Sequence, residues 1–516
     1  MEKYNETFIK RCDKTIEAMK EVTININQTI NEEINIITES LHDLKEELSD
    51  ANRKVSSLLD GDWSSWENWG PCSASCGGGI QSRHRTCSNP RPSLLGRYCD
   101  RSPDETRTCN KRRRCALGYY GTRFIFGYMK NFESNSSPTF YVICAQGEAI
   151  VRISIPDLSI DEEVSTVGGV LKKQYTNRLF SSSSGNISSK AVLVTTNTPV
   201  VIFSGNFGEA GASSDGSFIL PESSLGSTYL ISGHPSTAFG LDEFLVVGTS
   251  DTQVTFTSIS GFSETFALKR MQTYYKMASD MSGTMISASA PLFLLSGHSC
   301  ANIPDISVKY CDYIEAAMPP INALGSIHII SFMKPRPDFT VSIVAPFNQT
   351  SVTITDKVGN QIEILSLNER NTAFRTYTGS STISVLTDLP VLVTLYGHGG
   401  SKLGFGDPSM MIVPDITFFG HVYDFFVPTD FESSLQVIIS DTYPVSGLLL
   451  NGKPISPTET IVTTVPKHGT FTVVYADVVS GKYRVTHSLA NAVSFGAWLY
   501  GRTYKQEYAT NLGINV

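Results

Sequence analysis

The sequence predicts a mainly β protein with an N-terminal coiled-coil helix, a small three-stranded disulfide-rich module and a large repetitive β domain. Three observations support this prediction: an apolar heptad pattern near the N-terminus, six cysteines within 44 residues, and an internal repeat of about 95 to 100 residues. Because 516 residues exceed what one hydrophobic core usually supports, we place domains at residues 1–61, 62–116 and 117–516.

The composition is typical of a folded chain, since hydrophobic residues make up 41% and charged residues 17%. The net charge of -8 is unevenly distributed, because residues 63–115 contain ten Lys or Arg and only four Asp or Glu. A basic segment in an otherwise acidic chain favours a local binding site for polyanions. It argues against a protein that binds nucleic acid as a whole.

Residues 1–61 contain a seam of apolar side chains that is interrupted by one polar residue, Thr23. Its members alternate almost throughout between spacings of three and four residues; they are Ile9, Cys12, Ile16, Met19, Thr23, Ile26, Ile30, Ile34, Ile37, Leu41, Leu44, Leu48, Ala51, Val55 and Leu58. A 3.5-residue period places them on one face of a helix, which needs partner helices to bury that face. We therefore predict a self-associating stalk; the alternative is an amphipathic helix packed on the β domain.

Isoleucine occupies both kinds of core position in this seam, which favours three or four strands over two, so we predict a trimer. Consecutive four-residue steps at Ile26, Ile30 and Ile34 predict a stutter that locally unwinds the supercoil. The stalk would be about 75 Å long at 1.5 Å per residue. Cys12 lies on the seam, where it either crosslinks neighbouring chains or remains an unpaired core cysteine.

The module at residues 62–116 is too small to bury a stabilising core, so we expect crosslinks and stacking to hold it together. Trp63, Trp66 and Trp69 follow one another at three-residue steps. Arg83 and Arg85 alternate onto one face of a strand, where their guanidinium planes can stack between the indole rings by cation–π contact.

Four motifs in this module occur together: W-x-x-W-x-x-W from Trp63, C-S-x-S-C-G from Cys72, R-x-R-x-C from Arg83 and a closing Thr106-Arg107-Thr-Cys109. Together they resemble the thrombospondin type-1 repeat. The resemblance implies a layered Trp–Arg stack that includes Arg107. It further implies three disulfides, which pair Cys72 with Cys109, Cys76 with Cys115 and Cys87 with Cys99, and sugars on Trp63, Trp66 (C-mannose) and Ser75 (O-fucose).

Basic residues at the end of the module form a second candidate site. The run comprises Lys111, Arg112, Arg113 and Arg114, and it is preceded by Arg91, Arg97 and Arg101. We predict that these residues bind sulfated glycans, as many modules of the resembled family do. The alternative is that their charges are solvated edges or stacking partners inside the module.

Two signatures recur with one period in residues 117–516. We predict a short apolar strand that ends in glycine at 199–205, 291–297 and 390–397, with a fourth copy at 492–501. A segment from proline to Leu-Gly or Phe-Gly follows at 221–229, 320–328 and 414–423. Alternating strands such as 151–155, 254–256 and 352–354 lie between them. We predict four β-rich units, most simply sandwich-like, with a closed propeller-like ring as the alternative.

Further motifs in this region include Ser296-Gly297-His298-Ser299-Cys300, Ile303-Pro304, Tyr310-Cys311-Asp312, Gly406-Asp407-Pro408 and Val413-Pro414. Over about 400 residues the region resembles the N-terminal domain of IgG-Fc-binding protein. The resemblance implies an extracellular setting in mucus, adhesion or innate defence, and it suggests a disulfide between Cys300 and Cys311 that leaves Cys144 without an obvious partner. No residue can be matched to an antibody contact, so we do not carry immunoglobulin binding over.

Several features indicate an oxidising compartment. Six clustered cysteines imply oxidative folding, and N-glycosylation sequons occur at Asn5, Asn27, Asn135, Asn186 and Asn348. The first 20 residues are too charged for a signal peptide, and no apolar run is long enough to span a bilayer. We therefore expect a secreted protein whose signal or anchor sequence precedes this chain.

The candidates for chemistry are few. His298 and His398 follow the strand glycines at equivalent places, where other copies have Asn206 and Arg502, and such variation suits a side chain that caps a turn. Asp312 and Asp407 complete the set, and catalytic, phosphate-binding and dinucleotide motifs are missing from the sequence. We expect no enzyme, metal or cofactor.

The sequence therefore predicts an oligomeric extracellular adhesion or recognition protein that binds glycans or proteins. The alternatives are a structural matrix component and, with less support, a metal-dependent hydrolase with scattered ligands.

Overall fold

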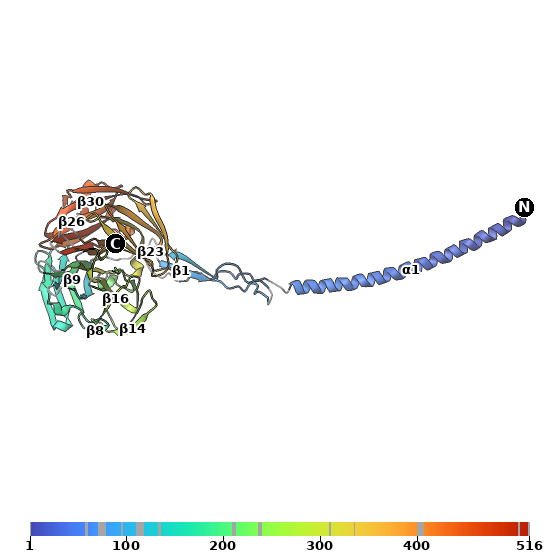
Figure 1. Cartoon of the computed structure of the whole chain (residues 1–516), viewed down its shortest axis with the longest axis horizontal. Helices are drawn as coiled ribbons and strands as arrows, with labels where there is room; N and C mark the ends of the chain where they lie inside the picture. Colours follow the sequence, from blue (N-terminus) through green and yellow to red (C-terminus); the bar gives the residue numbers. More distant parts are fainter. Residues whose placement is uncertain are drawn as a thin grey trace. The chain divides into compact units, whose positions relative to one another are not determined.

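The computed structural model describes residues 2–56, 60–70, 79–93, 96–109, 118–132, 136–208, 213–235, 240–308, 311–334, 336–399, 407–503 and 506–513. Two compact units are present. One contains the N-terminal helix and the Trp-rich module, and the other contains the β domain (Figure 1).

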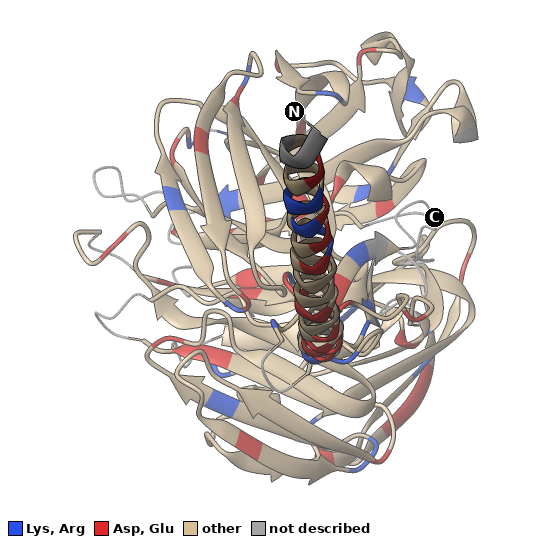
Figure 2. Ribbon diagram, turned by 90° about the vertical axis from the view of Figure 1, so that its right-hand side faces the viewer, with Lys and Arg blue, Asp and Glu red and all other residues tan. Residues whose placement is uncertain are grey.

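Helix α1, Glu2–Ser56, is continuous over 55 residues because no proline or glycine interrupts it. Its length is about 80 Å at 1.5 Å per residue. Threonines at four positions donate their hydroxyls to carbonyls one turn back, so they remain compatible with the helix; they are Thr15, Thr23, Thr29 and Thr38. Acidic and basic residues occur along the whole helix (Figure 2).

The apolar seam of α1 is uncovered in a single chain. Its large members are each between 46% and 69% exposed; they are Ile9, Ile16, Met19, Ile26, Ile30, Ile34, Ile37, Leu41, Leu44 and Leu48. A helix with so much exposed apolar surface is not in its lowest free-energy environment in water.

The Trp-rich module contains strand β1, Gly79–His84, paired with β2, Asp104–Cys109. The tryptophan segment runs beside β1 as the third strand of the module. The amides of Ser64, Glu67 and Gly70 donate to the carbonyls of Thr86, His84 and Ser82 at 2.7, 2.9 and 2.9 Å. Three residues of the tryptophan segment therefore advance as far as two residues of the facing strand, which explains why a three-residue Trp spacing matches a two-residue Arg spacing.

The β domain consists of four consecutive units of similar topology. The first contains β3 Gly121–Phe126, β4 Ser136–Cys144, β5 Ile150–Ile155, β6 Ile160–Ser165, β7 Val170–Gln174, β8 Asn186–Ser188, β9 Val192–Gly208 and β10 Asp215–Ile219. The second contains β11 Gly226–Leu230, β12 Asp242–Gly248, β13 Thr252–Thr257, β14 Ser263–Leu268, β15 Thr273–Ala278, β16 Met285–Ala301 and β17 Asp312–Ala317. Strand β8 leaves its own unit and pairs with β15 of the second.

The third and fourth units repeat this order. The third contains β18 Gly325–Ser331, β19 Phe339–Val344, β20 Thr350–Asp356, β21 Gln361–Leu367, β22 Thr372–Tyr377, β23 Thr382–Gly397 and β24 Ser409–Ile412. The fourth contains β25 Val422–Val427, β26 Glu432–Ser440, β27 Leu448–Leu450, β28 Lys453–Pro454, β29 Glu459–Val465, β30 Gly469–Val478, β31 Gly481–His487, β32 Phe495–Thr503 and β33 Gln506–Asn511. Between strands of the four units, the described residues form seven short 3-10 turns: η1 Pro156–Leu158, η2 Asn177–Leu179, η3 Glu222–Ser224, η4 Ile321–Ala323, η5 Ile416–Phe418, η6 Val445–Gly447 and η7 Ala490–Ala492.

Each of the first three units is a sandwich whose two sheets share one long strand. In β9, the N-terminal part pairs with β3 and β5, and the part after Pro199 pairs with β4 and β10. Strands β16 and β23 divide in the same way around Pro291 and Pro390. Proline cannot donate to a ladder, so it suits the point at which the strand passes between sheets. In the fourth unit β31 and β32 are separate strands that take these two roles.

The prediction of short strands that end in glycine was wrong for the first two units and the fourth, because the strands continue past Gly205, Gly297 and Gly501. These glycines instead permit close approach of the following strand. A Cβ on Gly205 or Gly297 would collide with the backbone of β10 or β17.

The four units close into a ring, so the sandwich and the ring descriptions both apply. Central strands β10, β17, β24 and β33 contact one another in a cycle in which β33 of the last unit meets β10 of the first. In Figure 1 the chain colours pass around the domain from teal through green and yellow to red. Four hydrophobic clusters fill the four junctions, and each contains buried residues of two adjacent units. The apolar core is therefore shared by neighbours rather than enclosed within a unit.

The second repeat signature forms the joint between adjacent units. Its proline precedes a 3-10 turn, and its glycine begins the first strand of the next unit, as at Pro221 and Gly226. Gly226 in turn lies against Pro320 of the next joint, and a Cβ on this glycine would stand 2.5 Å from the Cβ of that proline. The glycine recurs because the next turn packs directly on its Cα.

We expect Gly226→Ala to lower the free energy of unfolding by about 2 kcal/mol, because the added methyl group overpacks a joint closed by a rigid proline ring. Urea denaturation of the full chain measures the change. Gly118→Ala is the matched control, since a Cβ there has its nearest neighbour at 3.8 Å. Equal denaturation midpoints for the two variants would refute the packing role of Gly226.

Candidate functional site

The Trp-rich module contains a ladder of alternating indole rings and guanidinium groups. Arg85 lies 4.2 Å from the ring centroids of both Trp63 and Trp66. Arg83 lies 4.7 Å from that of Trp66 and 4.5 Å from that of Trp69. Arg107 completes the ladder at 4.2 Å from Trp69, so three arginines are used internally.

Polar contacts fix the edges of this ladder. Arg83 donates to Glu105 at 2.7 Å through Nε, and the Trp63 indole N–H donates to the carbonyl of Asp100 at 2.7 Å. The side chains of the other arginines, Arg91, Arg97 and Arg101, are exposed. They therefore remain available to a ligand, whereas the predicted run from Lys111 to Arg114 lies outside the described residues.

The structure contains two disulfides among the described cysteines. One joins Cys87 to Cys99 within the module, with a Cα–Cα distance of 5.7 Å. Another joins Cys300 to Cys311 in the β domain, with a Cα–Cα distance of 5.1 Å. Cys109 is also disulfide-bonded, and the remaining cysteines of the predicted pairs, Cys72, Cys76 and Cys115, lie outside the described residues. Cys144 is buried with a free thiol, and Cys12 has an exposed free thiol.

The predicted sugar attachment sites differ in accessibility. Asn186, at the start of β8, and Asn348 are both exposed. The indole rings of Trp63 and Trp66 are partly exposed within the ladder. Asn135 and Ser75 lie outside the described residues.

Sequence reasoning did not single out Asp215, which lies at the centre of the ring. Its carboxylate accepts backbone N–H groups from the three other central strands: Glu315 of β17 at 3.1 Å, Met410 of β24 at 3.1 Å and Ala509 of β33 at 3.3 Å. A fourth bond comes from the adjacent Gly216 at 2.8 Å. Burial raises the pKa of Asp215, and these amide bonds partly offset that rise. One side chain therefore ties all four units together.

Other buried carboxyl groups lie near this axis, and among the described residues no cationic partner fully offsets the cost of burying their negative charge. Burial raises the pKa of Glu315 to about 8, although the Tyr313 hydroxyl donates to it and opposes the rise. Burial also raises the pKa of Glu507 to about 7, which Arg336 opposes from 3.5 Å. The signal in the sequence was an acidic residue within an otherwise apolar strand, as in Tyr-Ile-Glu-Ala-Ala of β17.

Because the pKa values of these carboxyl groups are raised, we expect the β domain to lose stability as pH rises between about 6.5 and 8. A glutamate whose folded pKa is raised binds its proton more tightly when folded, so its contribution declines from its unfolded pKa up to its folded pKa. Burial is the chief cause that lowers the pKa values of His234 and His398 to about 4. These two buried histidines therefore make the folded domain more stable as pH rises from 4 to 6.5, which is opposite to the effect of the glutamates. Urea midpoints across this range measure the decline, and Glu315→Gln with Glu507→Gln should make it shallower. Asp215 and Asp312, whose pKa values burial also raises, account for the remainder. A midpoint that rises with pH above 6.5 would contradict this assignment.

The residues considered for chemistry are engaged in structural bonds. His298 is fully buried, and its Nδ1 accepts the backbone N–H of Cys300 at 3.1 Å. His398 lies 2.9 Å through Nε2 from the hydroxyl of Thr340. Asp312 accepts the amide of Ser214 at 3.0 Å and a hydroxyl from Ser213. Burial raises its pKa, and the charge of Asp407 raises it further. Within the described ranges, no group of three or more His, Cys, Asp or Glu side chains is arranged to hold a metal ion.

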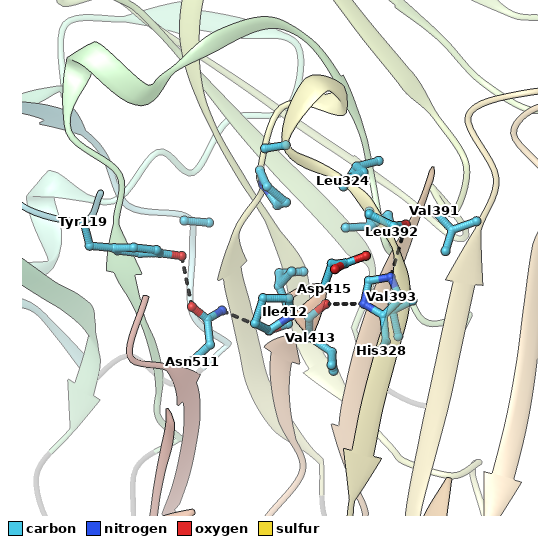
Figure 3. Close-up of a pocket in the computed structure, with 15 residues that line it drawn as sticks. Tyr119, Leu324, His328, Val391, Leu392, Val393, Ile412, Val413, Asp415 and Asn511 are labelled. Carbon is cyan, nitrogen blue, oxygen red and sulfur yellow. Dashed lines mark hydrogen bonds between the residues drawn. The ribbon is translucent and has the colours of Figure 1, made fainter. Parts of the chain in front are cut away.

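A small cavity lies between the central strands and the η4 joint (Figure 3). Its volume of about 20 Å³ suffices for one water molecule but not for an organic ligand. Tyr119 donates to Asn511 at 3.1 Å, and Asn511 donates to the carbonyl of Ile412 at 2.9 Å. His328 bonds the carbonyl of Val413 at 3.0 Å. The cavity is therefore part of the region in which all four units meet.

Among the described residues, no helix combines the length and the hydropathy that crossing a bilayer requires.

Comparison with known proteins finds matches to two families in this chain. Residues 64–115 match the thrombospondin type 1 domain. Human hemicentin-1 is 48% identical over 54 residues, which cover 10% of this chain and 1% of that protein. Human A disintegrin and metalloproteinase with thrombospondin motifs 16 is 45% identical over 53 residues, 10% of this chain and 4% of that protein. Thrombospondin-1 of Xenopus laevis is 36% identical over 81 residues, 14% of this chain and 7% of that protein.

The chain thus spans only a small part of the length of these relatives, and the likeness to a metalloproteinase is confined to the module. The other family model, described as IgGFc binding protein, matches residues 215–501 and thereby more than half of the chain. Both families are adhesion-type modules of extracellular or matrix proteins. Through this larger match, the chain belongs to the IgGFc binding protein family.

Proposed function

We propose that this chain is a secreted, oligomeric adhesion or recognition protein that presents two kinds of binding module in several copies. The observation that carries the proposal is the 55-residue helix with a seam of exposed apolar side chains. Three parallel copies would bury this seam as a coiled coil, and isoleucine at both kinds of core position favours three strands. Coupled copies bind a multisite surface more tightly than one copy does.

The Trp-rich module supports a role in binding sulfated glycans. Arg91, Arg97 and Arg101 are exposed, whereas Arg83, Arg85 and Arg107 are occupied by the tryptophan ladder. Because the arginines and tryptophans of the ladder stack on one another, the ladder provides a rigid support for the exposed cations. The β ring, in which His298, His398 and Asp312 are held in structural bonds, suits a role as a rigid scaffold that recognises an extracellular partner.

Retention on a heparin-coated surface tests the proposal. We compare the full chain with a variant that carries Ile30→Asp and Ile34→Asp, because two buried charges would prevent assembly of the seam. The variant should dissociate at least about tenfold faster, and raising the salt concentration from 0.15 to 0.5 M should weaken retention of both proteins.

Gln28→Glu and Asn35→Asp add the same two negative charges at exposed positions outside the seam, so this variant is the matched control and should dissociate as slowly as the natural chain. Equal dissociation of the seam variant and this control would defeat the role of multivalency. An insoluble chain without saturable binding would favour the structural matrix alternative.

A further inference from the structure

A groove opens on the fourth unit of the β domain. It lies at the ends of strands β26, β30 and β32 and has a volume of about 590 Å³, within the range of sites that bind ligands. Three carboxylates line it: Asp430, Glu432 and Asp477, the last at the end of β30. Lys334 and Arg502 also reach the groove.

The two cations of this groove are already paired. Arg502 lies 3.1 Å through Nη2 from Glu432, and Lys334 lies 2.7 Å through Nζ from Glu459. Asp430 is exposed and has no ion pair among the described residues. Asp477 is exposed as well, and its one partner within the described part of the chain is the hydroxyl of Ser434, which donates to it at 3.2 Å. Two carboxylates therefore have no cationic partner among the residues that the structure describes, and the groove attracts positive charge.

Apolar side chains complete the lining beside these carboxylates. Phe431 packs its ring against Tyr508, with the centroids 5.0 Å apart, which holds it rigidly. Val479 in the turn after β30 is 74% exposed. A rigid aromatic ring and an exposed valine next to unpaired carboxylates suit a ligand that is partly apolar and partly cationic.

We propose that this groove binds an extended segment of a partner protein in which Lys or Arg alternates with apolar residues. A sulfated or otherwise anionic glycan would meet two unpaired carboxylates and is disfavoured here, so the groove and the basic module select ligands of opposite charge. The inference deepens the proposed function, because it names the partner chemistry of the β domain.

Fluorescence anisotropy with the full chain tests the inference. The probe is a fluorescein-labelled octapeptide of alternating Lys and Val with both ends blocked, and the comparators are a Glu–Val octapeptide and labelled mannohexaose. Asp430→Asn and Asp477→Asn should each weaken Lys–Val binding about fivefold, as expected for exposed charge pairs, and the double variant about twentyfold. Asp157→Asn, an exposed carboxylate in the first unit, is the matched control and should leave the affinity unchanged.

The inference is overturned if the double variant binds the Lys–Val peptide as the natural chain does, or if Asp157→Asn weakens it equally, which would indicate attraction to the net negative charge alone. It is also overturned if mannohexaose, and not the peptide, shows binding that the aspartate variants reduce. The affinity is measured per chain, so it does not depend on the stalk. Faster loss of the seam variant from heparin together with intact peptide affinity is therefore the expected result, and failure of one measurement counts against its own claim alone.

Discussion

Replacing Asp215 by alanine is expected to lower the free energy of unfolding of the β domain by at least about 4 kcal/mol. The carboxylate accepts amide N–H groups from all three other central strands, at 3.1 to 3.3 Å, in a fully buried site. Removing it leaves these donors without an acceptor, and each unsatisfied buried group costs about 1 to 3 kcal/mol. Thermal unfolding of the full chain, followed by circular dichroism, measures the loss.

Two further variants make this result interpretable. Asp215→Asn keeps one acceptor oxygen and should lose less stability than the alanine variant. Asp157→Ala removes an exposed carboxylate and should leave the transition within about 0.5 kcal/mol of the natural chain. If Asp215→Ala unfolds at the same temperature as Asp157→Ala, the ring does not depend on its axial carboxylate.

Replacing Trp66 by alanine should destabilise the Trp-rich module by about 3 kcal/mol. The ring of Trp66 lies between Arg83 and Arg85, at 4.7 and 4.2 Å, so its removal separates both guanidinium groups from their shared neighbour. A module of this size has little other apolar packing to compensate. Tryptophan fluorescence reports the change, since three of the four tryptophans of the chain lie in this segment.

Tyr98→Ala is the matched control for this prediction, because Tyr98 is an aromatic residue of the same module that is 73% exposed. It should shift the fluorescence transition little. A transition of the Trp66 variant that coincides with that of the Tyr98 variant would show that disulfides alone stabilise the module.

Patterns that are local in sequence predicted much of this structure. The apolar heptad pattern predicted the long helix. The three-residue tryptophan spacing predicted a ladder, because each stacked pair lies within 38 positions in the sequence. The two repeat signatures predicted four units, since each signature performs the same packing role at each joint: Gly226, for example, admits Pro320. The contacts that hold one unit together can therefore be predicted from the sequence of one repeat.

Features that depend on contacts between residues far apart in the sequence could not be predicted from such local patterns. Asp215 bonds to residues about 100, 195 and 294 positions away, which are one, two and three repeat periods. The repeat shows that these positions are equivalent, but it does not show that the four equivalent strands meet at one axis. The passage of β9 between two sheets at Pro199 follows from the packing of seven strands, not from the strand's own sequence. The groove beside Asp430 and Asp477 likewise exists only because the ends of separate strands meet.

The most direct test of the account is the mass of the full chain in solution, measured by sedimentation equilibrium at micromolar concentration. Assembly through the apolar seam of α1 predicts three times the chain mass of 56.4 kDa, and a single-chain mass for the variant with Ile30→Asp and Ile34→Asp. A natural chain that sediments at the mass of one copy would contradict the claim that this protein acts by presenting its binding surfaces together.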